Sequence, residues 1–217
     1  VPAFAVGRTQ DILYILSKLG REGRLPPLNV YVDSPLAKEA TKIYDSHPEL
    51  YDEEAKKLFH LKSDKKALKV HFTGSVEESQ RINQIEKGAI IIAGSGMCEG
   101  GRIRHHFKHN LWRPECSIIF TGFQARGTLG RMLVDGAKRV IILKEKIAVK
   151  ARIYTIGGFS AHADQKELLE WLGLFRDHPE VFIVHGEENA ALEFEKAVKE
   201  KLGFTTRVPR YGESFDI

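Results

Sequence analysis

Short runs of β-branched and other apolar residues alternate along the chain with segments whose apolar residues recur at helical spacing. This alternation is typical of βαβ units, in which helices cover a mainly parallel sheet. The sequence therefore predicts an α/β fold with a mainly parallel sheet flanked by helices. Strands are expected at 3–6, 30–33, 89–93, 117–122, 139–143, 151–156, 181–185 and 205–208. Helices are expected at 79–86, 102–111, 165–176 and 189–202, with others after Thr9 and Pro35.

Local signals give some of these elements their boundaries. Thr9 is expected to cap the first helix, and Thr128 to open the helix that follows the strand at 117–122. Residues 48–66 are charged and only weakly periodic, and we expect a helix and a loop there. The rhythm is interrupted near 136–150, where KEKIAVKA predicts short antiparallel strands. Two lobes of the chain are expected to meet at this point.

The composition describes a soluble globular chain that can form a core of its own. Its 217 residues are 42% apolar and carry 33 basic and 29 acidic side chains, for a formal charge of +4. A chain of this length buries roughly 70% of its unfolded surface, so it needs no disulfide or structural metal. The small positive charge is compatible with a nucleic-acid partner but does not by itself favour one.

Membrane segments and secretory signals are not expected. The longest apolar runs fall far short of the ~18 residues that a membrane span requires. The N-terminus has no basic segment before an apolar stretch, and it lacks an initiator Met, which indicates a truncated or processed chain. Cys98 and Cys116 have no second pair, which favours reduced thiols in a cytoplasmic protein over a disulfide framework or a CxxC zinc site.

The segment GSGMCEGG at 94–101 predicts a glycine-rich turn between a buried strand and a helix. Such a turn presents backbone N–H groups at a helix N-terminus and so attracts phosphate. A dinucleotide fingerprint would need Gly at position 99, which is Glu, and a P-loop would need Lys where Arg102 stands. We therefore expect no nucleotide cofactor. A phosphate-binding loop backed by Arg102 and Arg104 and a merely tight structural turn both remain open.

Two further segments carry positive charge. The helix RIRHHFKHNLWR at 102–113 is either a footprint for a polyanion backbone or a solvated basic face whose Phe107 points to the core. The segment GFQARGTLGR at 122–131 repeats the plan of strand, glycine-rich turn and helix, with Arg126 and Arg131 as candidate cations. If both turns lie at the same ends of neighbouring parallel strands, they create one crevice.

Two histidines stand where a predicted strand gives way to a loop before a helix: His162 in GFSAHAD and His185 in VHGEENA. If the strands that precede them are neighbours, both imidazoles lie on one rim, where one could ligate a metal and the other move a proton. The alternative for each is a hydrogen-bonded structural residue. The nearby Asp164 and Glu187 are expected to cap helices rather than to bind metal.

The order of these motifs resembles the β-CASP branch of the metallo-β-lactamase nucleases, which includes bacterial and archaeal RNA-processing enzymes. The segments VPAFAVGRTQDIL at 1–13 and VDSPLA at 32–37 also match the β-CASP cassette, so the resemblance covers nearly the whole chain. It implies a β-CASP domain at 1–140, partial at its N-terminus, and the C-terminal part of a metallo-β-lactamase αββα fold at 141–217, of the RNA-metabolising type.

The resemblance also implies roles for individual residues. His162 matches a histidine that assists proton transfer beside the scissile phosphate, and His185 matches a ligand of one of two zinc ions. A His at the latter position is the version associated in this family with RNA. The residues expected to contact RNA phosphates are Ser95, Arg102, Arg126, Thr128, Arg131 and Ser160.

The sequence departs from the family pattern in one respect, because no HxHxDH motif occurs in it. We therefore expect the C-terminal part of a longer zinc-dependent ribonuclease acting on single-stranded RNA, nearly inert alone because its zinc site is incomplete. The alternative is a non-catalytic RNA-binding or assembly module of the same fold. In either case the truncation predicts an exposed apolar face near 181–185, covered by formation of a homodimer.

Overall fold

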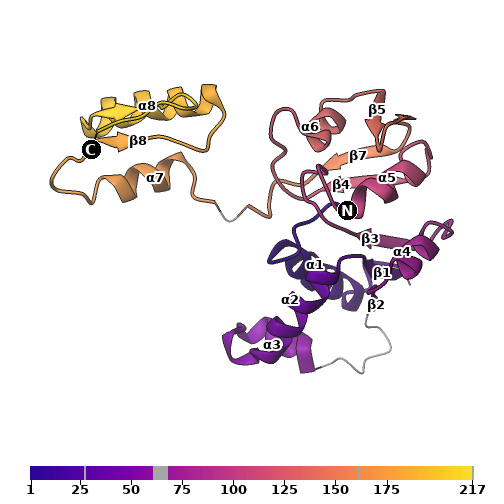
Figure 1. Cartoon of the computed structure of the whole chain (residues 1–217). Helices are drawn as coiled ribbons and strands as arrows, with labels where there is room; N and C mark the ends of the chain where they lie inside the picture. Colours follow the sequence, from indigo (N-terminus) through magenta and orange to yellow (C-terminus); the bar gives the residue numbers. More distant parts are fainter. Residues whose placement is uncertain (27, 61–67, 161, 217) are drawn as a thin grey trace. The chain divides into compact units, whose positions relative to one another are not determined.

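The computed structural model describes residues 1–26, 28–60, 68–160 and 162–216 (Figure 1). The chain forms two compact units, Val1–Ser160 and Ala161–Ile217. The first contains α1 (Arg8–Arg21), β1 (Asn29–Val32), α2 (Pro35–Ser46), η1 (Pro48–Leu50), α3 (Glu53–His60), β2 (Lys69–Phe72), α4 (Val76–Ile82), β3 (Ala89–Ile92), α5 (Ile103–Asn110), β4 (Ser117–Phe120), α6 (Leu129–Val134), β5 (Arg139–Ile142), β6 (Glu145–Ala148) and β7 (Arg152–Thr155). The second contains α7 (Gln165–Leu172), β8 (Val181–Phe182), α8 (Glu188–Leu202) and β9 (Thr206–Arg207).

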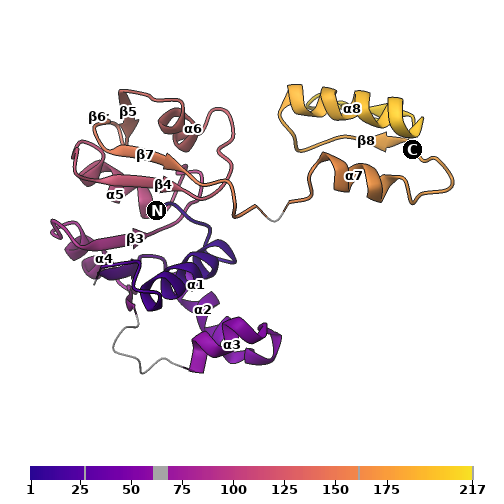
Figure 2. The same cartoon turned by 180° about the vertical axis from the view of Figure 1, so that it is seen from behind.

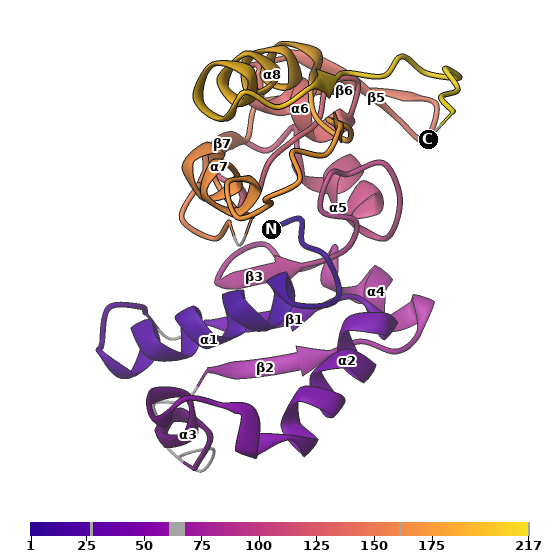
Figure 3. The same ribbon diagram turned by 90° about the vertical axis from the view of Figure 1, so that its left-hand side faces the viewer.

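The first sheet of the Val1–Ser160 unit is parallel, with the strand order β2-β1-β3. Alternate residues of β1 point to opposite faces, and Val30 and Val32 lie fully buried on one of them. Ile12 of α1 and Ala37 of α2 pack against these valines together with Ile92. Figure 3 shows α1 and α2 running beside this sheet, which identifies the face that they cover.

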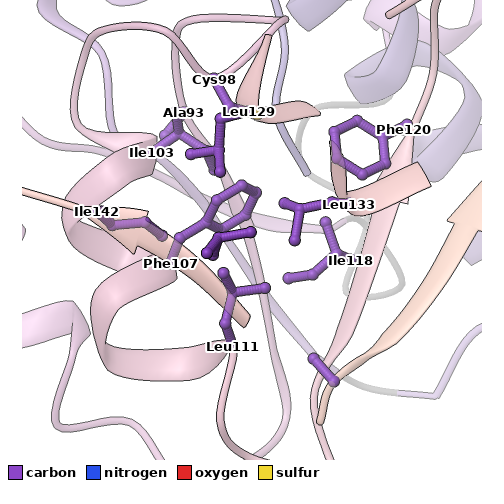
Figure 4. Close-up of a cluster of buried hydrophobic side chains, with 12 residues drawn as sticks. Ala93, Cys98, Ile103, Phe107, Leu111, Ile118, Phe120, Leu129, Leu133 and Ile142 are labelled. Atoms are coloured by element: carbon purple, nitrogen blue, oxygen red, sulfur yellow. The ribbon is translucent and has the colours of Figure 1, made fainter. Parts of the chain in front are cut away.

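A second core in the same unit surrounds Phe107 of α5 (Figure 4). Phe120 of β4, Leu133 of α6 and Ile142 of β5 converge on it, and all are almost completely buried. β4 pairs with β7 in parallel, while β5 and β6 form the antiparallel hairpin visible in Figure 2. Helix α5 joins this core because Ile103 and Phe107 recur at helical spacing on one stripe.

The Ala161–Ile217 unit has its own small core. Leu169 and Leu172 of α7 pack with Val198 of α8 and with Phe204, while β8 pairs in parallel with β9. Helix α7 begins with a capping box in which the Asp164 side chain accepts a hydrogen bond from the backbone of Glu167 and the Glu167 side chain accepts one in return.

The predicted α/β class and the mainly parallel pairing are confirmed. Strands expected at 30–33, 89–93 and 117–122 appear as β1, β3 and β4, and the antiparallel pair near 136–150 appears as β5 and β6. Thr128 caps α6 as expected, since its side chain accepts a hydrogen bond from the amide of Arg131. None of the helices in the described part of the chain is long and apolar enough to cross a membrane.

The prediction for the first residues is wrong. Residues 3–6 do not form a strand, and pairing there is limited to a single bridge between Pro2 and Ala93. Thr9 is not a cap either, because the N-cap of α1 is Gly7 and the Thr9 hydroxyl donates a 2.8 Å hydrogen bond to the carbonyl of Phe4. The chain turns sharply at Gly7, whose φ of 79° suits glycine.

Three other elements differ from the prediction. Lys69–Phe72 forms β2, which the sequence did not indicate, and the helix expected at 79–86 begins earlier, at Val76, with a capping box between Ser75 and Glu78. The helix expected within 48–66 is α3, and residues 61–66 of that prediction lie outside the described residues. The expected strand at 181–185 is reduced to β8.

The strands at 151–156 and 181–185 are not neighbours in the described sheets. β7 pairs with β4 in one unit, and β8 pairs with β9 in the other. Strand pairing therefore does not place His162 and His185 on one rim.

Candidate functional site

The glycine-rich turn at 94–101 is closed by its own hydrogen bonds. The amide of Ser95 donates to the carbonyl of Gly100 at 3.0 Å, and the Ser95 hydroxyl accepts from the Gly100 amide at 3.2 Å. The amide of Ile103 donates to the carbonyl of Gly94 at 2.9 Å. Gly101 has a φ of 74°, and a Cβ there would lie 2.2 Å from the Gly94 oxygen, so only glycine fits.

The second turn, at 122–131, docks directly onto the first. The Gln124 side-chain amide donates to the carbonyl of Gly96 at 3.1 Å. The amide of Leu129 donates to the Glu99 carboxylate at 2.5 Å, and the amide of Gly130 donates to the carbonyl of Met97 at 3.2 Å. With Thr128 accepting from the Arg131 amide, the first amides of α6 are already used inside the protein. The two turns contact each other through these bonds, but β3 and β4 belong to different sheets, so the crevice expected between neighbouring parallel strands is not formed in that way.

A buried polar cluster surrounds Asp33, which directly follows β1. Its side chain is fully buried. One carboxylate oxygen accepts a 2.5 Å hydrogen bond from the Ser79 hydroxyl and lies 2.6 Å from Nε2 of His106. The other accepts from the Arg102 guanidinium at 2.7 Å and from the hydroxyl of Thr73. One carboxylate thus joins the ends of β1 and β2 to α4 and α5.

This environment keeps the carboxylate ionised. Burial raises the pKa of Asp33, but the hydrogen bonds from His106, Ser79, Thr73 and Arg102 outweigh it and hold the pKa well below its usual range. The second ring nitrogen of His106 is paired too, 2.9 Å from the side-chain oxygen of Asn83. Both ring nitrogens of the buried imidazole therefore have polar partners.

Sequence reasoning missed this cluster. Two local signals point to it: a carboxylate directly after the buried strand Asn29–Val32, and a histidine on the apolar stripe of α5 between Ile103 and Phe107. The interpretation of α5 as a helix with Phe107 turned to the core is confirmed. Its exposed basic residues include His105 and His109. The pKa of His109 is lowered, mainly by partial burial of the ring and secondly by the charge of Lys108.

The predicted RNA contacts of the first unit occupy different environments. Arg102 points into the Asp33 cluster, with 22% of its side chain exposed. Arg131 holds both carboxylate oxygens of Asp135 at 2.9 Å. Arg126 and Ser160 are exposed. The segment before Ser160 is anchored to α1, because the Arg8 guanidinium lies 5.2 Å from the ring centre of Phe159.

The two candidate catalytic histidines belong to the second unit, and both are exposed. His162 lies in the loop that leads to the Asp164 cap of α7. His185 follows β8 with a φ of 65° and precedes Glu187, the N-cap residue of α8, whose side chain makes no capping hydrogen bond. His185 also lines a groove of about 410 Å³ with Trp171 and other apolar side chains. Both histidines thus lie two residues before the N-cap residue of a helix.

The described residues do not form a zinc site by themselves. No group of three or more His, Cys, Asp or Glu side chains among them is arranged to hold a metal ion. Burial raises the pKa of Cys98 to about 12 and also raises that of Cys116. A zinc ion at His185 would need ligands from outside the described residues.

Two domain families match this chain. Residues 9–133 match the Beta-Casp domain, and residues 146–209 match the Zn-dependent metallo-hydrolase RNA specificity domain. The first match lies within the Val1–Ser160 unit, and most of the second lies within the Ala161–Ile217 unit. The chain belongs to the β-CASP family.

Curated relatives refine this assignment. Ribonuclease TTHA0252 of Thermus thermophilus is 36% identical over the whole chain, which covers 49% of that protein. Transcription termination factor FttA of Methanosarcina mazei is 34% identical over 95% of the chain and 34% of its own length. The RNase J-like protein of Methanocaldococcus jannaschii is 31% identical over 98% of the chain and 48% of its own length. The chain thus spans half or less of the length of these relatives.

Proposed function

We propose that this chain is the C-terminal part of a zinc-dependent β-CASP ribonuclease that hydrolyses phosphodiester bonds of single-stranded RNA. The observation that carries the proposal is the match of residues 146–209 to the Zn-dependent metallo-hydrolase RNA specificity domain, because this segment contains both His162 and His185. A ribonuclease among the relatives supports the same reaction class. Since the chain is about half as long as that ribonuclease, the activity belongs to a longer protein.

The exposed histidines have separate roles in this proposal. His162 gives a proton to the oxygen that leaves when the phosphodiester bond breaks, a task for which an imidazole is well suited near neutral pH. His185 supplies one imidazole nitrogen to a zinc ion, and the rest of the protein supplies the other ligands. Zinc, when bound, stabilises charge on the phosphoryl group and lowers the pKa of water. The chain alone is expected to be nearly inactive.

The RNA backbone is proposed to pass along the two interlocked turns. Of the six expected phosphate contacts, Arg126 and Ser160 are exposed. Arg102 contacts Asp33, and Arg131 contacts Asp135. Ser95 and Thr128 act mainly through the shape of the turns, because their hydroxyls hold backbone groups.

A second candidate function is a non-catalytic RNA-binding or assembly module. Both candidates agree with the absence of a metal-binding group among the residues that the structure describes. The two candidates differ in whether the sequence upstream of Val1 supplies the missing zinc ligands.

The deciding experiment measures zinc content and cleavage of single-stranded RNA, on this chain and on a version extended to the natural start of its gene. His162→Ala and His185→Ala are made in both, and His47→Ala, an exposed histidine of the first unit, is the matched control. The ribonuclease proposal expects about two zinc ions and cleavage in the extended form. His185→Ala lowers zinc content, whereas His162→Ala removes cleavage and keeps the zinc. An extended form that binds RNA but holds no zinc and cuts nothing establishes the second candidate.

The apolar surface of the second unit is proposed to form a homodimer contact. Val184 and Trp171 beside β8 are 68% and 56% exposed, and they border the groove that His185 lines. Exposed apolar surface of this kind marks an interaction face. Light scattering is expected to give the mass of a dimer, and Val184→Lys to give that of a monomer. A monomeric chain that binds little apolar dye contradicts this contact.

A cytoplasmic location is proposed on the basis of the cysteines. Cys98 and Cys116 are both free thiols, and Cys98 is buried. Reduced, unpaired cysteines are typical of proteins in reducing compartments.

A further inference from the structure

The β2-β1-β3 sheet has a second face, opposite the one that α1 and α2 cover. Parallel sheets are usually buried on both faces, because crossover helices pack against each side. Here the second face bears a groove of about 420 Å³, with Tyr31 and His71 on its floor and Arg81, Ile82 and Ile85 along its wall. The register pairs Tyr31 directly with His71, so both side chains project from the same face.

The floor of the groove is a preformed aromatic platform. The rings of Tyr31 and His71 are stacked, with centroids 4.9 Å apart and planes inclined by 20°. The side-chain oxygen of Asn29 lies 3.0 Å from Nε2 of His71, which fixes the orientation of the imidazole ring. His71 is exposed and Tyr31 half-buried. An open pair of stacked rings suits a flat, aromatic ligand.

The charge around the groove favours an anion. Arg81 is exposed on the wall, and Lys69 is exposed on β2, two positions before His71 and therefore on the same face. Glu78 also borders the groove, but its carboxylate accepts hydrogen bonds from the amides of Gly74, at 2.6 Å, and Ser75, at 3.2 Å. These amides lower the pKa of Glu78, and its carboxylate is engaged in the cap of α4.

We propose that this groove binds one nucleobase of single-stranded RNA, stacked on the Tyr31–His71 pair, with Arg81 and Lys69 against the adjoining phosphates. Every base has a flat π-face, and stacking on aromatic side chains is a general way to hold an unpaired nucleotide without reading its sequence. The inference rests on the proposed action on RNA. It adds a second contact, on a different surface from the interlocked turns, that holds the strand rather than cutting it.

The test measures RNA binding by the complete 217-residue chain. The probe is an oligouridylate of about eight nucleotides with 5-iodouridine for photocrosslinking, compared with an abasic strand of equal length. Tyr31→Leu and His71→Ala are each expected to weaken binding roughly ten-fold, while Tyr31→Phe stays within about two-fold of wild type because phenylalanine still stacks. The matched control is Tyr154→Leu, which alters a 47% exposed tyrosine on β7. The abasic strand lacks a base to stack. Its affinity for the wild type is therefore expected to be no higher than the affinity of the complete probe for Tyr31→Leu or His71→Ala.

Crosslinks are expected in the peptides that contain Tyr31 or His71. The groove is excluded if the variant at the exposed His71, His71→Ala, binds as tightly as wild type, or if every crosslink falls outside β1, β2 and α4. Because this assay needs no cleavage, crosslinks in the groove of an extended protein that cuts nothing would overturn the ribonuclease proposal alone. Cleavage with no crosslink in the groove would overturn this inference alone. Competition by free uridine monophosphate at equal strength would indicate a nucleotide site instead of an RNA contact.

Discussion

Four long-range polar contacts of the first unit converge on the Asp33 side chain. The partners lie just after β2, in α4, and just before and within α5, up to 73 positions away in the chain. A buried carboxylate is costly unless all its oxygen lone pairs find donors, and here they do. The cluster therefore specifies how α5 sits against the ends of β1 and β2.

Replacing Asp33 with asparagine is expected to lower the free energy of unfolding by about 3–5 kcal/mol near neutral pH, because Arg102 loses its buried counter-charge and His106 loses its charged hydrogen-bond partner. The low pKa of Asp33 means that its contribution is complete above the ordinary aspartate pKa of about 4 and is lost as pH falls toward the folded-state value. The gap between wild type and variant should therefore shrink in acid. Urea unfolding at several pH values measures this, with the exposed Asp135→Asn as control. A gap that stays constant down to strongly acidic pH would contradict the assignment.

Gly101→Ala is expected to destabilise the first unit far more than Gly100→Ala. Position 101 combines a φ of 74° with a Cβ contact of 2.2 Å to a backbone oxygen, whereas a Cβ at position 100 meets nothing within 4 Å. The left-handed conformation alone costs about 1–2 kcal/mol for a residue with a side chain. Thermal unfolding of the two variants checks this. Equal melting temperatures would show that the turn can relax.

Candidate site residues stand out in the sequence only where the signal is local. His162 and His185 stand out because each follows a strand pattern and precedes a helix cap. The inward turn of Arg102 could not be predicted, since its partner Asp33 is 69 positions away and a basic residue beside a glycine turn looks the same in either role.

At the scale of single elements, the caps at Thr128 and Asp164 were predictable, but the side chains of Thr9 and Glu187 do not form the caps expected of them. Strand edges were not predictable. Thr128 and Asp164 act as N-caps because the bond each makes reaches only three residues along the chain. Residues 3–6 have the apolar pattern of a strand, but a strand also needs a partner over several residues. β2 escaped notice because its alternate positions, Lys69 and His71, are polar and exposed.

Asp164→Ala is expected to destabilise the second unit by about 1 kcal/mol, because the Glu167 amide at the start of α7 loses its side-chain acceptor. Asp164→Asn should cost much less, since asparagine is an equally good N-cap. Unfolding monitored by Trp171 fluorescence follows the unit directly. The same loss in both variants would mean that charge near His162, rather than the cap, stabilises this helix end.

For the molecule as a whole, each unit has a hydrophobic core built from its own residues. Leu133 is fully buried among α5, β4 and β5 of the first, and Val198 is fully buried between α7 and Phe204 of the second. Leu133→Ala is expected to cost about 2–5 kcal/mol and Val198→Ala somewhat less. Each should lower amide hydrogen-exchange protection in its own unit. Loss of protection in both units from either substitution would show a single cooperative domain.

The family could be predicted from the order of four sequence motifs, because that order can be recognised without knowing which strands pair. The pairing itself could not. Nothing local distinguishes a β7 that pairs with β4 from one that pairs with β8, and the choice depends on which surfaces the intervening helices bury.

The contact between the two glycine turns has a consequence for inheritance. The Glu99 carboxylate and the Met97 carbonyl accept hydrogen bonds from the first amides of α6. A Cβ at Gly130 would lie 1.7 Å from the Gln124 side chain. A substitution in one turn therefore requires a compatible residue in the other. Grafting residues 94–101 from a relative should therefore give a poorly folded chimaera, and grafting 122–131 with them should restore it, so the two stretches evolve as one unit of descent.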